Sequence, residues 1–575
     1  MKKQFLPSFI AAGVLLFSAT TSHAQKRDTT AHPKLAVVIV VDQFRQEYLT
    51  RYSKFFGKDG FNRLMKNGAH FTGAHYSHAT TYTGPGHAQI LSGSFGHTNG
   101  IVGNRWWNPQ SKQVETMFYD ANAKIPGVEL SPKDDDTSPR NFIGNNLSDE
   151  LLLSNHFKSK AIGIALKDRA AVMLAGKLGR AYWFHEQVGG MVTSTYYQPT
   201  LPAWVKLFNA RKIPESYFGK AWKKSLPEAE YSISRADDFP QETDFEGLGR
   251  AFPHVLSDKS GKPSPNFYTA FTATPFATDY TLQLARTAIE SEQLGADEYP
   301  DMLGVSITPT DIAGHAFGPD SHEIEDMIAR LDGQLAGFLK YLDTRFKKGE
   351  VVITLTADHG ATPLPEYMQT LGVDAGRIKK KQLGDAIEKA LTARFGDPDN
   401  RSEMDLQFGD PIVQNLKWVT LLEDPSVFLN REIIAAKKLD PAEVQRVVGE
   451  ATLTVPGILA YYTRDQIQNG KMPNNRWSPM FEKSFYAARS GDVLLQTKPY
   501  YFWGSYGEKD SGSTHGSPYE YDTHVPLIFM GAGIRPGTYK GNVDITDIAP
   551  TLAGVLSIAT PVGNEGRALH EIFER

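Results

Sequence analysis

The sequence of 575 residues contains no cysteine. Disulfide bonds are therefore excluded, and so is the lipid that bacterial lipoproteins carry on a cysteine. A metal site in this protein must be built from oxygen and imidazole ligands, because no thiolate is available.

The sequence also lacks an excess of basic residues and a hydrophobic run long enough to span a bilayer. The formal net charge is −4, so we expect no nucleic-acid partner. Lys2 and Lys3 precede an apolar run at 9–17, and Ser22–Ala24 resembles a cleavage site. The run is too short to span a bilayer. We therefore expect residues 1–24 to be a secretory signal peptide and the mature chain to be a periplasmic or secreted monomer without a membrane span.

Residues 25–575 have the composition of a globular protein, with 41% apolar and 22% charged residues over the whole chain. β-branched runs predict buried strands of a mostly parallel sheet, and helical patterns lie between them. The predicted strands are 35–41, 161–169, 302–307 and 351–357, with helices at about 55–70 and 320–345. The fold class is thus α/β, a single domain with a central sheet flanked by helices. Segments at about 180–295 and 365–485 depart from this pattern, and we interpret them as insertions.

Carboxylates and an imidazole stand where two of these strands end. Asp42 directly follows strand 35–41, and Asp358 and His359 follow strand 351–357. Ligands bind at the carboxyl ends of parallel strands, so these side chains are expected to share one site. The alternative for Asp42 is a helix cap, whereas an adjacent Asp-His pair is unusual for structure alone.

Two cations end a third strand. Lys167 and Arg169 lie at the end of strand 161–169, where the alternation of strand side chains would place both on one face. Two cations on one face could grip a phosphoryl group. The alternative is a solvated strand end without a function.

Further candidate ligands follow the strand at 302–307. Asp311 and His315 are four residues apart, a spacing that can place both on one face of a turn or short helix. His515 lies in a glycine-containing loop before residues 524–531, which we interpret as an edge-like strand because they contain proline.

A hydroxyl and an amide occur in glycine-rich stretches. Thr83–His87 has the sequence Thr-Gly-Pro-Gly-His, which predicts a turn, and 88–93 predicts one or two helical turns. A hydroxyl just before a helix can act as a nucleophile held against an anion. The alternative is an N-capping threonine in a surface turn. Asn104 is either an amide donor to an anionic oxygen or an ordinary turn residue.

In this order, the candidate residues resemble the alkaline phosphatase superfamily, and within it the periplasmic PafA-type alkaline phosphatases. The shared motifs are T-G-P-G-H at 83–87, K-x-R at 167–169 and T-A-D-H-G at 356–360. The resemblance covers residues 35–175, 300–362 and 510–575, approximately. It implies an alkaline-phosphatase-like sandwich whose insertions cap the active site.

The resemblance also implies two zinc ions per chain, each held by oxygen and imidazole ligands. The ligands of the first zinc would be Asp311, His315 and His515. The ligands of the second zinc would be Asp42, Asp358, His359 and Thr83. We prefer His515 to His524 because its position before the last core strand matches the family spacing.

The implied activity is hydrolysis of phosphate monoesters through a phosphothreonine on Thr83, with release of inorganic phosphate. Asn104, Lys167 and Arg169 would contact the phosphoryl oxygens. The alternatives are a nucleotide pyrophosphatase/phosphodiesterase and, in another class, a non-catalytic periplasmic protein that binds phosphate or metal. A sulfatase is disfavoured, because threonine cannot form the formylglycine that sulfatases need and because His87 stands where their motif has arginine.

Overall fold

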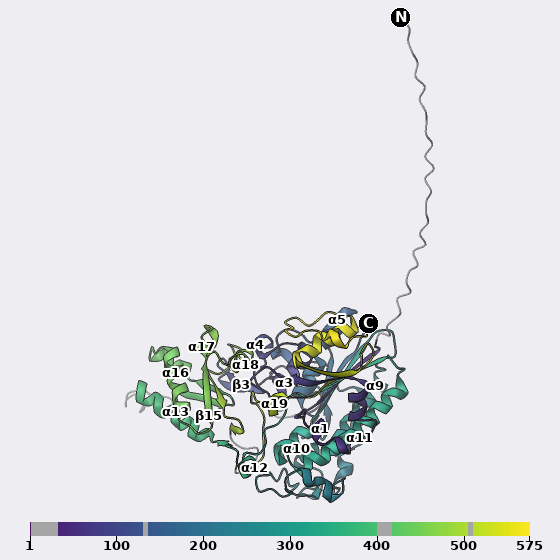
Figure 1. The fold of residues 1–575 in the computed structure, drawn as a ribbon, viewed down its shortest axis with the longest axis horizontal. Helices are drawn as coiled ribbons and strands as arrows, with labels where there is room; N and C mark the ends of the chain where they lie inside the picture. Colours follow the sequence, from purple (N-terminus) through teal and green to yellow (C-terminus); the bar gives the residue numbers. More distant parts are fainter. Residues whose placement is uncertain (2–32, 130–135, 399–416, 504–509, 575) are drawn as a thin grey trace.

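The computed structural model describes residues 1, 33–129, 136–398, 417–503 and 510–574. A nine-stranded sheet runs through the larger part of the molecule, and a smaller lobe lies beside it (Figure 1). In the described ranges, no helix combines the length and the apolar character that a membrane crossing requires. After Met1, the predicted signal peptide lies outside the described residues.

The central sheet is mostly parallel, as the sequence predicted. Its order is β19-β2-β18-β11-β1-β10-β5-β6-β7. The strands are β1 (Leu35–Val41), β2 (Ala69–His75), β5 (Ala161–Ala165), β6 (Arg180–His185), β7 (Gly190–Val192), β10 (Asp301–Ile307), β11 (Val351–Thr356), β18 (Leu527–Gly531) and β19 (Gly537–Asp544). All seven residues of β1 are buried, as expected for a strand covered on both faces. The predicted α/β class is confirmed.

Helices cover the sheet. In Figure 1, α5 (Leu147–Ser154) lies at the top of the sheet region, and α9 (Pro275–Ser291) and α11 (His322–Arg345) lie toward its lower right. The helices nearest the candidate site are α3 (Thr83–Ser92), α6 (Asp168–Ala175) and α10 (Pro309–Phe317). The apolar stripe of α11, which includes Leu331 and Leu335, is buried in the main core.

The interpretation of residues 524–531 as an edge-like strand is wrong. β18 begins at Leu527 and runs antiparallel between β2 and β11, so it is an interior strand. Pro526 directly precedes it, where a missing N–H removes no hydrogen bond between strands.

The prediction that Lys167 and Arg169 share a strand face is also wrong. β5 ends at Ala165, Lys167 is the N-cap residue of α6, and Arg169 lies in the first turn of that helix. The Ala-rich stretch that follows favours a helix, and Asp168 suits its first turn, so the extended chain ends earlier than the sequence suggested.

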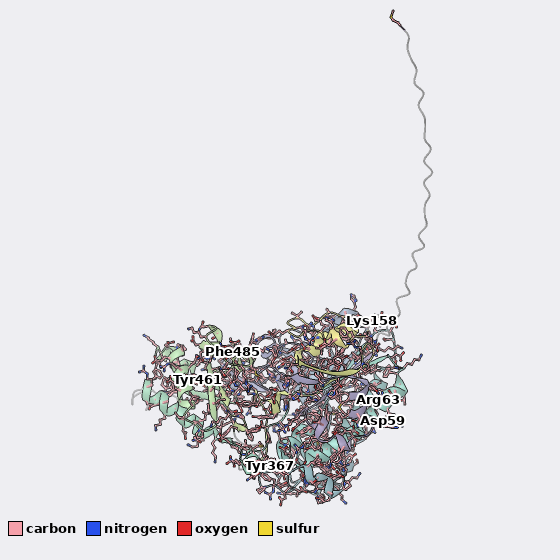
Figure 2. All side chains as sticks on the ribbon, viewed as in Figure 1. Asp59, Arg63, Lys158, Tyr367, Tyr461 and Phe485 are labelled. Atoms are coloured by element: carbon pink, nitrogen blue, oxygen red, sulfur yellow. The ribbon has the colours of Figure 1, made fainter. Side chains whose placement is uncertain are left out.

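The two predicted insertions differ in their relation to the sheet. Residues 180–295 include β6 and β7, which extend the central sheet, and α9, which packs on β10 and β5. Residues 365–485 contribute to the smaller lobe, where α13 (Lys380–Phe395) and α16 (Pro441–Thr452) accompany a four-stranded sheet of β13 (Val419–Glu423), β14 (Ser426–Leu429), β16 (Val493–Thr497) and β15 (Ile458–Thr463). Tyr461 marks this lobe in Figure 2, far from Arg63 at the opposite side of the view.

Close packing of α6 on β5 yields a prediction about Gly163. A Cβ at Gly163 would come within 2.1 Å of the Ala171 carbonyl oxygen and 2.7 Å of the Ala175 nitrogen. Gly163→Ala should therefore lower the free energy of unfolding by about 1–3 kcal/mol or more, because backbone must move. Gly333→Ala on α11 is the matched control, since its Cβ would meet no atom within 4 Å. Thermal unfolding of both variants measures the difference, and an equal stability would contradict the prediction.

Candidate metal centre and active site

The order of four neighbouring strands brings the candidate residues together. β11, β1, β10 and β5 are adjacent and parallel, and Val41 is in register with Ile307. Their carboxyl ends therefore meet at one edge of the sheet. Asp358, Asp42, Asp311 and Lys167 follow the four strands in this spatial order.

His515 reaches the same edge from the opposite chain direction. Because β18 is antiparallel, the residues before it lie at the carboxyl edge of the parallel strands. Asp522 holds the local loops together. Its Oδ2 accepts hydrogen bonds from the Ser517 backbone nitrogen (2.8 Å) and hydroxyl (2.5 Å), and its backbone carbonyl accepts from Gly360 (2.8 Å). The loop that carries His515 is thus tied to the loop that carries His359.

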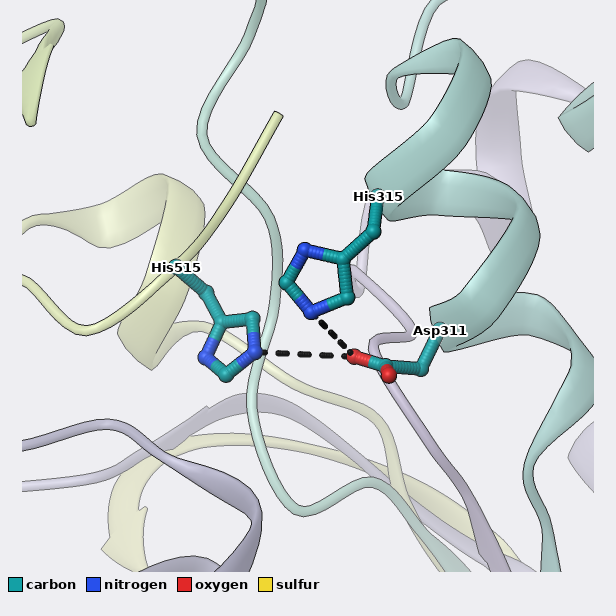
Figure 3. Close-up of side chains that lie close together, drawn as sticks. All are labelled: Asp311, His315 and His515. Atoms are coloured by element: carbon teal, nitrogen blue, oxygen red, sulfur yellow. Dashed lines mark ion pairs between the residues drawn. The ribbon is translucent and has the colours of Figure 1, made fainter. Parts of the chain in front are cut away.

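Asp311, His315 and His515 form the first group of side chains that could hold a metal ion (Figure 3). Asp311 Oδ1 lies 3.3 Å from His315 Nε2 and 3.5 Å from His515 Nε2. The Nδ1 atoms of these histidines lie 2.8 Å from the Ser513 carbonyl and 2.7 Å from the Thr81 carbonyl. A histidine that donates from Nδ1 presents Nε2 as an unprotonated ligand, which is the usual arrangement beside a metal.

A second group surrounds His359. The His359 Nε2 atom lies 3.5 Å from Asp42 Oδ1, 3.3 Å from Asp358 Oδ2 and 3.4 Å from Thr83 Oγ1. Its Nδ1 lies 2.9 Å from the Gly360 carbonyl. All four predicted residues of the second set are therefore neighbours.

His524 belongs to neither group. Its ring stacks on His75 with centroids 4.3 Å apart, and its Nε2 lies 2.9 Å from the Thr72 carbonyl.

The buried charges of this edge fit a divalent cation. Asp42 and Asp358 are fully buried, and one oxygen of each, Asp42 Oδ1 and Asp358 Oδ2, has no hydrogen-bond donor. A buried carboxylate oxygen without a donor is costly unless a cation neutralises it. Carboxylate oxygens and imidazole nitrogens are ligands that zinc accepts.

The pKa shifts of the site residues also reflect negative charge that is buried without enough compensating positive charge. Burial, reinforced by Asp311 and Asp358, raises the pKa of Asp42 well above its usual value. Burial raises the pKa of Asp358 to about 7 and lowers the pKa of His515 to about 4. Burial alone would raise the pKa of Asp311 too, but His315 and Lys167 hold it well below its usual value. Burial thus favours neutral rings at His359 and His515, and the buried Asp42 and Asp358 carboxylates would be stabilised by added positive charge.

Thr83 is the first residue of α3, and its side chain is buried. The expected turn is corrected here, because Gly84, Pro85 and Gly86 form the first turn of the helix. Proline is tolerated in a first turn, since N–H groups there have no partner in the helix. A Cβ on Gly86 would come within 2.1 Å of the Asp358 carbonyl oxygen, so glycine lets α3 approach the second group.

The three predicted anion-binding residues, Asn104, Lys167 and Arg169, differ in their contacts near Thr83 and in their exposure to solvent. Asn104 Oδ1 accepts a hydrogen bond of 2.9 Å from the Gly84 nitrogen. Lys167 Nζ lies 3.3 Å from Thr83 Oγ1. The Arg169 side chain has an exposed fraction of 31%, against 11% for Lys167, and its guanidinium lies 3.7 Å from Asp168 Oδ1.

Two buried polar residues of the site were missed by the sequence interpretation. His87 Nδ1 lies 3.0 Å from the Thr83 carbonyl and its Nε2 3.0 Å from Ser306 Oγ. Gln43, next to Asp42, lies among the carboxylates. His87 could have been found from its place in the T-G-P-G-H motif, whereas no pattern marks Gln43.

Comparison with known proteins identifies the family. Residues 36–518 match the family described as type I phosphodiesterase / nucleotide pyrophosphatase. The chain belongs to this family. The crystal structure of alkaline phosphatase PafA is similar to this chain with a TM-score of 0.85 and 32% identity, over 94% of this chain and 99% of that one.

Full-length sequence relatives agree with this assignment. Alkaline phosphatase PafA of Elizabethkingia meningoseptica is 33% identical over 98% of each chain. A protein of Myroides odoratus named calcium-transporting ATPase is 34% identical over 99% of this chain and 100% of its own. The predicted resemblance to the alkaline phosphatase superfamily is confirmed, as is the prediction of an enzyme of the alkaline phosphatase type.

Proposed function

We propose that this protein is a zinc-dependent phosphate monoester hydrolase that acts through a phosphothreonine on Thr83. The observation that carries the proposal is the position of the Thr83 hydroxyl, 3.4 Å from His359 Nε2 and 3.3 Å from Lys167 Nζ at the start of a helix. Export, a periplasmic location, a monomeric state and the absence of a nucleic-acid partner remain part of the proposal.

The two metal groups would be Asp311, His315 and His515 on one side and Asp42, Asp358, His359 and Thr83 on the other. Two zinc ions held there would supply Lewis acidity toward the attacking and leaving oxygens. Two observations support this proposal: Asp42, Asp358 and His359 are fully buried, and burial lowers the pKa of His359 and of His515, which favours neutral rings that can bind a metal.

The proposed reaction has two displacements at phosphorus. Thr83 Oγ1 loses its proton and forms a bond to phosphorus as the bond to the ester oxygen breaks, and the alcohol leaves with a proton. Water then attacks the phosphothreonine, inorganic phosphate leaves, and the Thr83 hydroxyl regains its proton. Asn104, Lys167 and Arg169 would stabilise charge on the non-bridging oxygens.

The N-termini of α3 and α6 support the binding of an anion near Thr83. Helix N-termini carry a partial positive charge that favours a negatively charged ligand. Cations are unfavourable at such an end, yet Lys167 and Arg169 both stand at the start of α6. A dianion bound at the start of α6 would compensate both cations. A phosphate monoester is a dianion and a diester is a monoanion, so this arrangement favours monoesters as substrates.

A nucleotide pyrophosphatase/phosphodiesterase is the second candidate, since the matching family bears that description. Family members of both kinds can share a threonine nucleophile, so the ester preference must be measured. A non-catalytic protein that binds phosphate or metal is disfavoured, because simple binding does not require a buried hydroxyl between metal ligands.

The first prediction concerns metal content. The protein should hold about two zinc ions per chain, and activity should return with zinc after chelation. His515→Ala should lose one ion, whereas His524→Ala should keep both, since His524 lies outside both groups. Elemental analysis of the purified variants measures this, and full activity without zinc would refute the proposal.

The second prediction concerns the nucleophile. Thr83→Ala should lower kcat/KM for an aryl phosphate by about 10³-fold or more, while Thr83→Ser should retain much activity because the hydroxyl is kept. Acid-quenched peptide mapping during turnover should place phosphate on Thr83. Thr80→Ala is the control, and phosphate on a different residue would contradict the assignment of Thr83 as the nucleophile.

The third prediction concerns ester preference. Arg169→Ala should lower monoester kcat/KM by about 10²-fold or more, the scale for loss of one transition-state donor, and should affect the methyl diester much less. Lys167→Ala should lower both activities, because Lys167 also pairs with Asp42 (2.8 Å) and Asp311 (2.5 Å). Arg180→Ala, whose guanidinium pairs with Glu292, is the control. An equal loss of both activities in Arg169→Ala would show that this cation does not discriminate.

A further inference from the structure

Gln43 connects the two metal groups. Its side-chain Nε2 donates a hydrogen bond of 2.9 Å to Asp311 Oδ1, and its backbone nitrogen donates one of 3.2 Å to Asp358 Oδ1. Asp311 belongs to the first group and Asp358 to the second. One buried residue therefore contacts one carboxylate of each group.

The backbone of Gln43 is held in an unusual conformation. Its φ is +61°, in the left-handed region that a long side chain seldom occupies. Such a conformation costs about 1–3 kcal/mol and persists where surrounding structure requires it, often at functional sites. Here the turn directs the N–H toward Asp358 and the side chain toward Asp311.

The side-chain amide has one orientation that the site can accept. A carboxylate oxygen cannot accept from the amide oxygen, so Nε2 must face Asp311. The amide oxygen Oε1 then lies against Gly314 of α10, where a Cβ would come within 1.8 Å of it. The glycine of helix α10 makes space for the amide beside Asp311 and His315.

The oxygen that Gln43 contacts is the one on which both groups converge. Asp311 Oδ1 lies 3.3 Å from His315 Nε2 but also 3.9 Å from His359 Nε2 of the second group. The Asp311 carboxylate could therefore serve either group, because it also lies close enough to Asp42 and His359 to hold a metal ion with them. A hydrogen bond from Gln43, together with Lys167 on Oδ2 at 2.5 Å, fixes its rotation.

We propose that Gln43 is a positioning residue that holds Asp311 for the His315–His515 group while its own backbone anchors Asp358 of the other group. This inference rests on the zinc pair of the proposed function. Side chains that orient metal ligands change metal affinity by about 10- to 100-fold when they are lost. The expected effect is therefore on the binding of one zinc ion more than of the other.

Gln43→Met tests the proposal, because methionine keeps the length of the side chain and removes the donor. Zinc titration of the metal-free protein against a chromophoric chelator should show one of the two ions bound about 10- to 100-fold more weakly. In a His515→Ala background, where the first group is already broken, Gln43→Met should change the affinity of the remaining ion little. Gln46→Met is the matched control, since Gln46 is buried in the same segment and contacts His70 instead.

Gln43→Gly separates positioning from a purely structural role. Glycine adopts the positive φ without strain, which offsets part of the stability lost with the buried side chain, so the metal-free protein should still unfold in one cooperative transition while zinc binding weakens. Unchanged zinc affinity in Gln43→Met and Gln43→Gly would overturn the proposal, as would equal weakening of both ions. A wild-type protein that binds no zinc would instead refute the proposed function, before any variant is compared.

Discussion

The site depends on the register of four parallel strands that end side by side. β1 is paired in parallel with β10 and β11, so the chain leaves the sheet at nearly the same level after each strand. Three carboxylates thereby meet in a buried position, where they repel one another and have lost their hydration. Lys167, which follows β5, is the cation that the chain itself supplies to Asp42 and Asp311. This concentration of negative charge destabilises the fold of the metal-free protein, and a bound cation would offset that cost by neutralising the carboxylates.

Two helices that start at this edge, α3 and α6, supply the hydroxyl and the cations of the candidate site. α3 presents Thr83 and lies close to the backbone of Asp358, which a side chain on Gly86 would prevent. α6 packs against α3 and begins with the two cations. Asp42 and Asp358, two of the candidate metal ligands, thus follow strand ends, whereas Lys167 and Arg169, two of the proposed anion-binding residues, lie at a helix start. The two kinds of group meet at the hydroxyl of Thr83.

Much of this arrangement could be predicted from the sequence because the signals are local. The unbroken β-branched run of β1 predicts a strand buried on both faces, and a strand of that kind places Asp42 at the carboxyl edge. The spacing of Asp311 and His315 likewise matches one face of α10. The family motifs added the grouping of ligands, which no local pattern contains.

Other features depend on contacts between distant segments, and the sequence interpretation missed them. Proline near β18 suggested an edge, but the strand lies between β2 and β11. Lys167 and Arg169 looked like a strand end because apolar residues precede them, whereas the helical preference of the following residues prevails. The contacts of Gln43 with Asp311 and Asp358 depend on the left-handed turn and the space at Gly314, neither of which has a sequence signature.

The candidate site is complete only when β18 has formed, because this antiparallel strand, near the end of the chain, brings His515 to the carboxyl edge of the parallel strands. This strand is the hydrogen-bonded connection between β11 and the β2–β19 pair, and His515 lies in the loop that leads to α19 (Glu520–Thr523), the short helix before this strand. During synthesis of the chain, Asp42, Asp311 and Asp358 are made long before β18 and His515. A shortened chain that ends before this segment would leave the sheet divided and the carboxylates without their last imidazole neighbour. Pairings over such sequence distances form slowly, so the sheet and the site would mature together as a late event in folding.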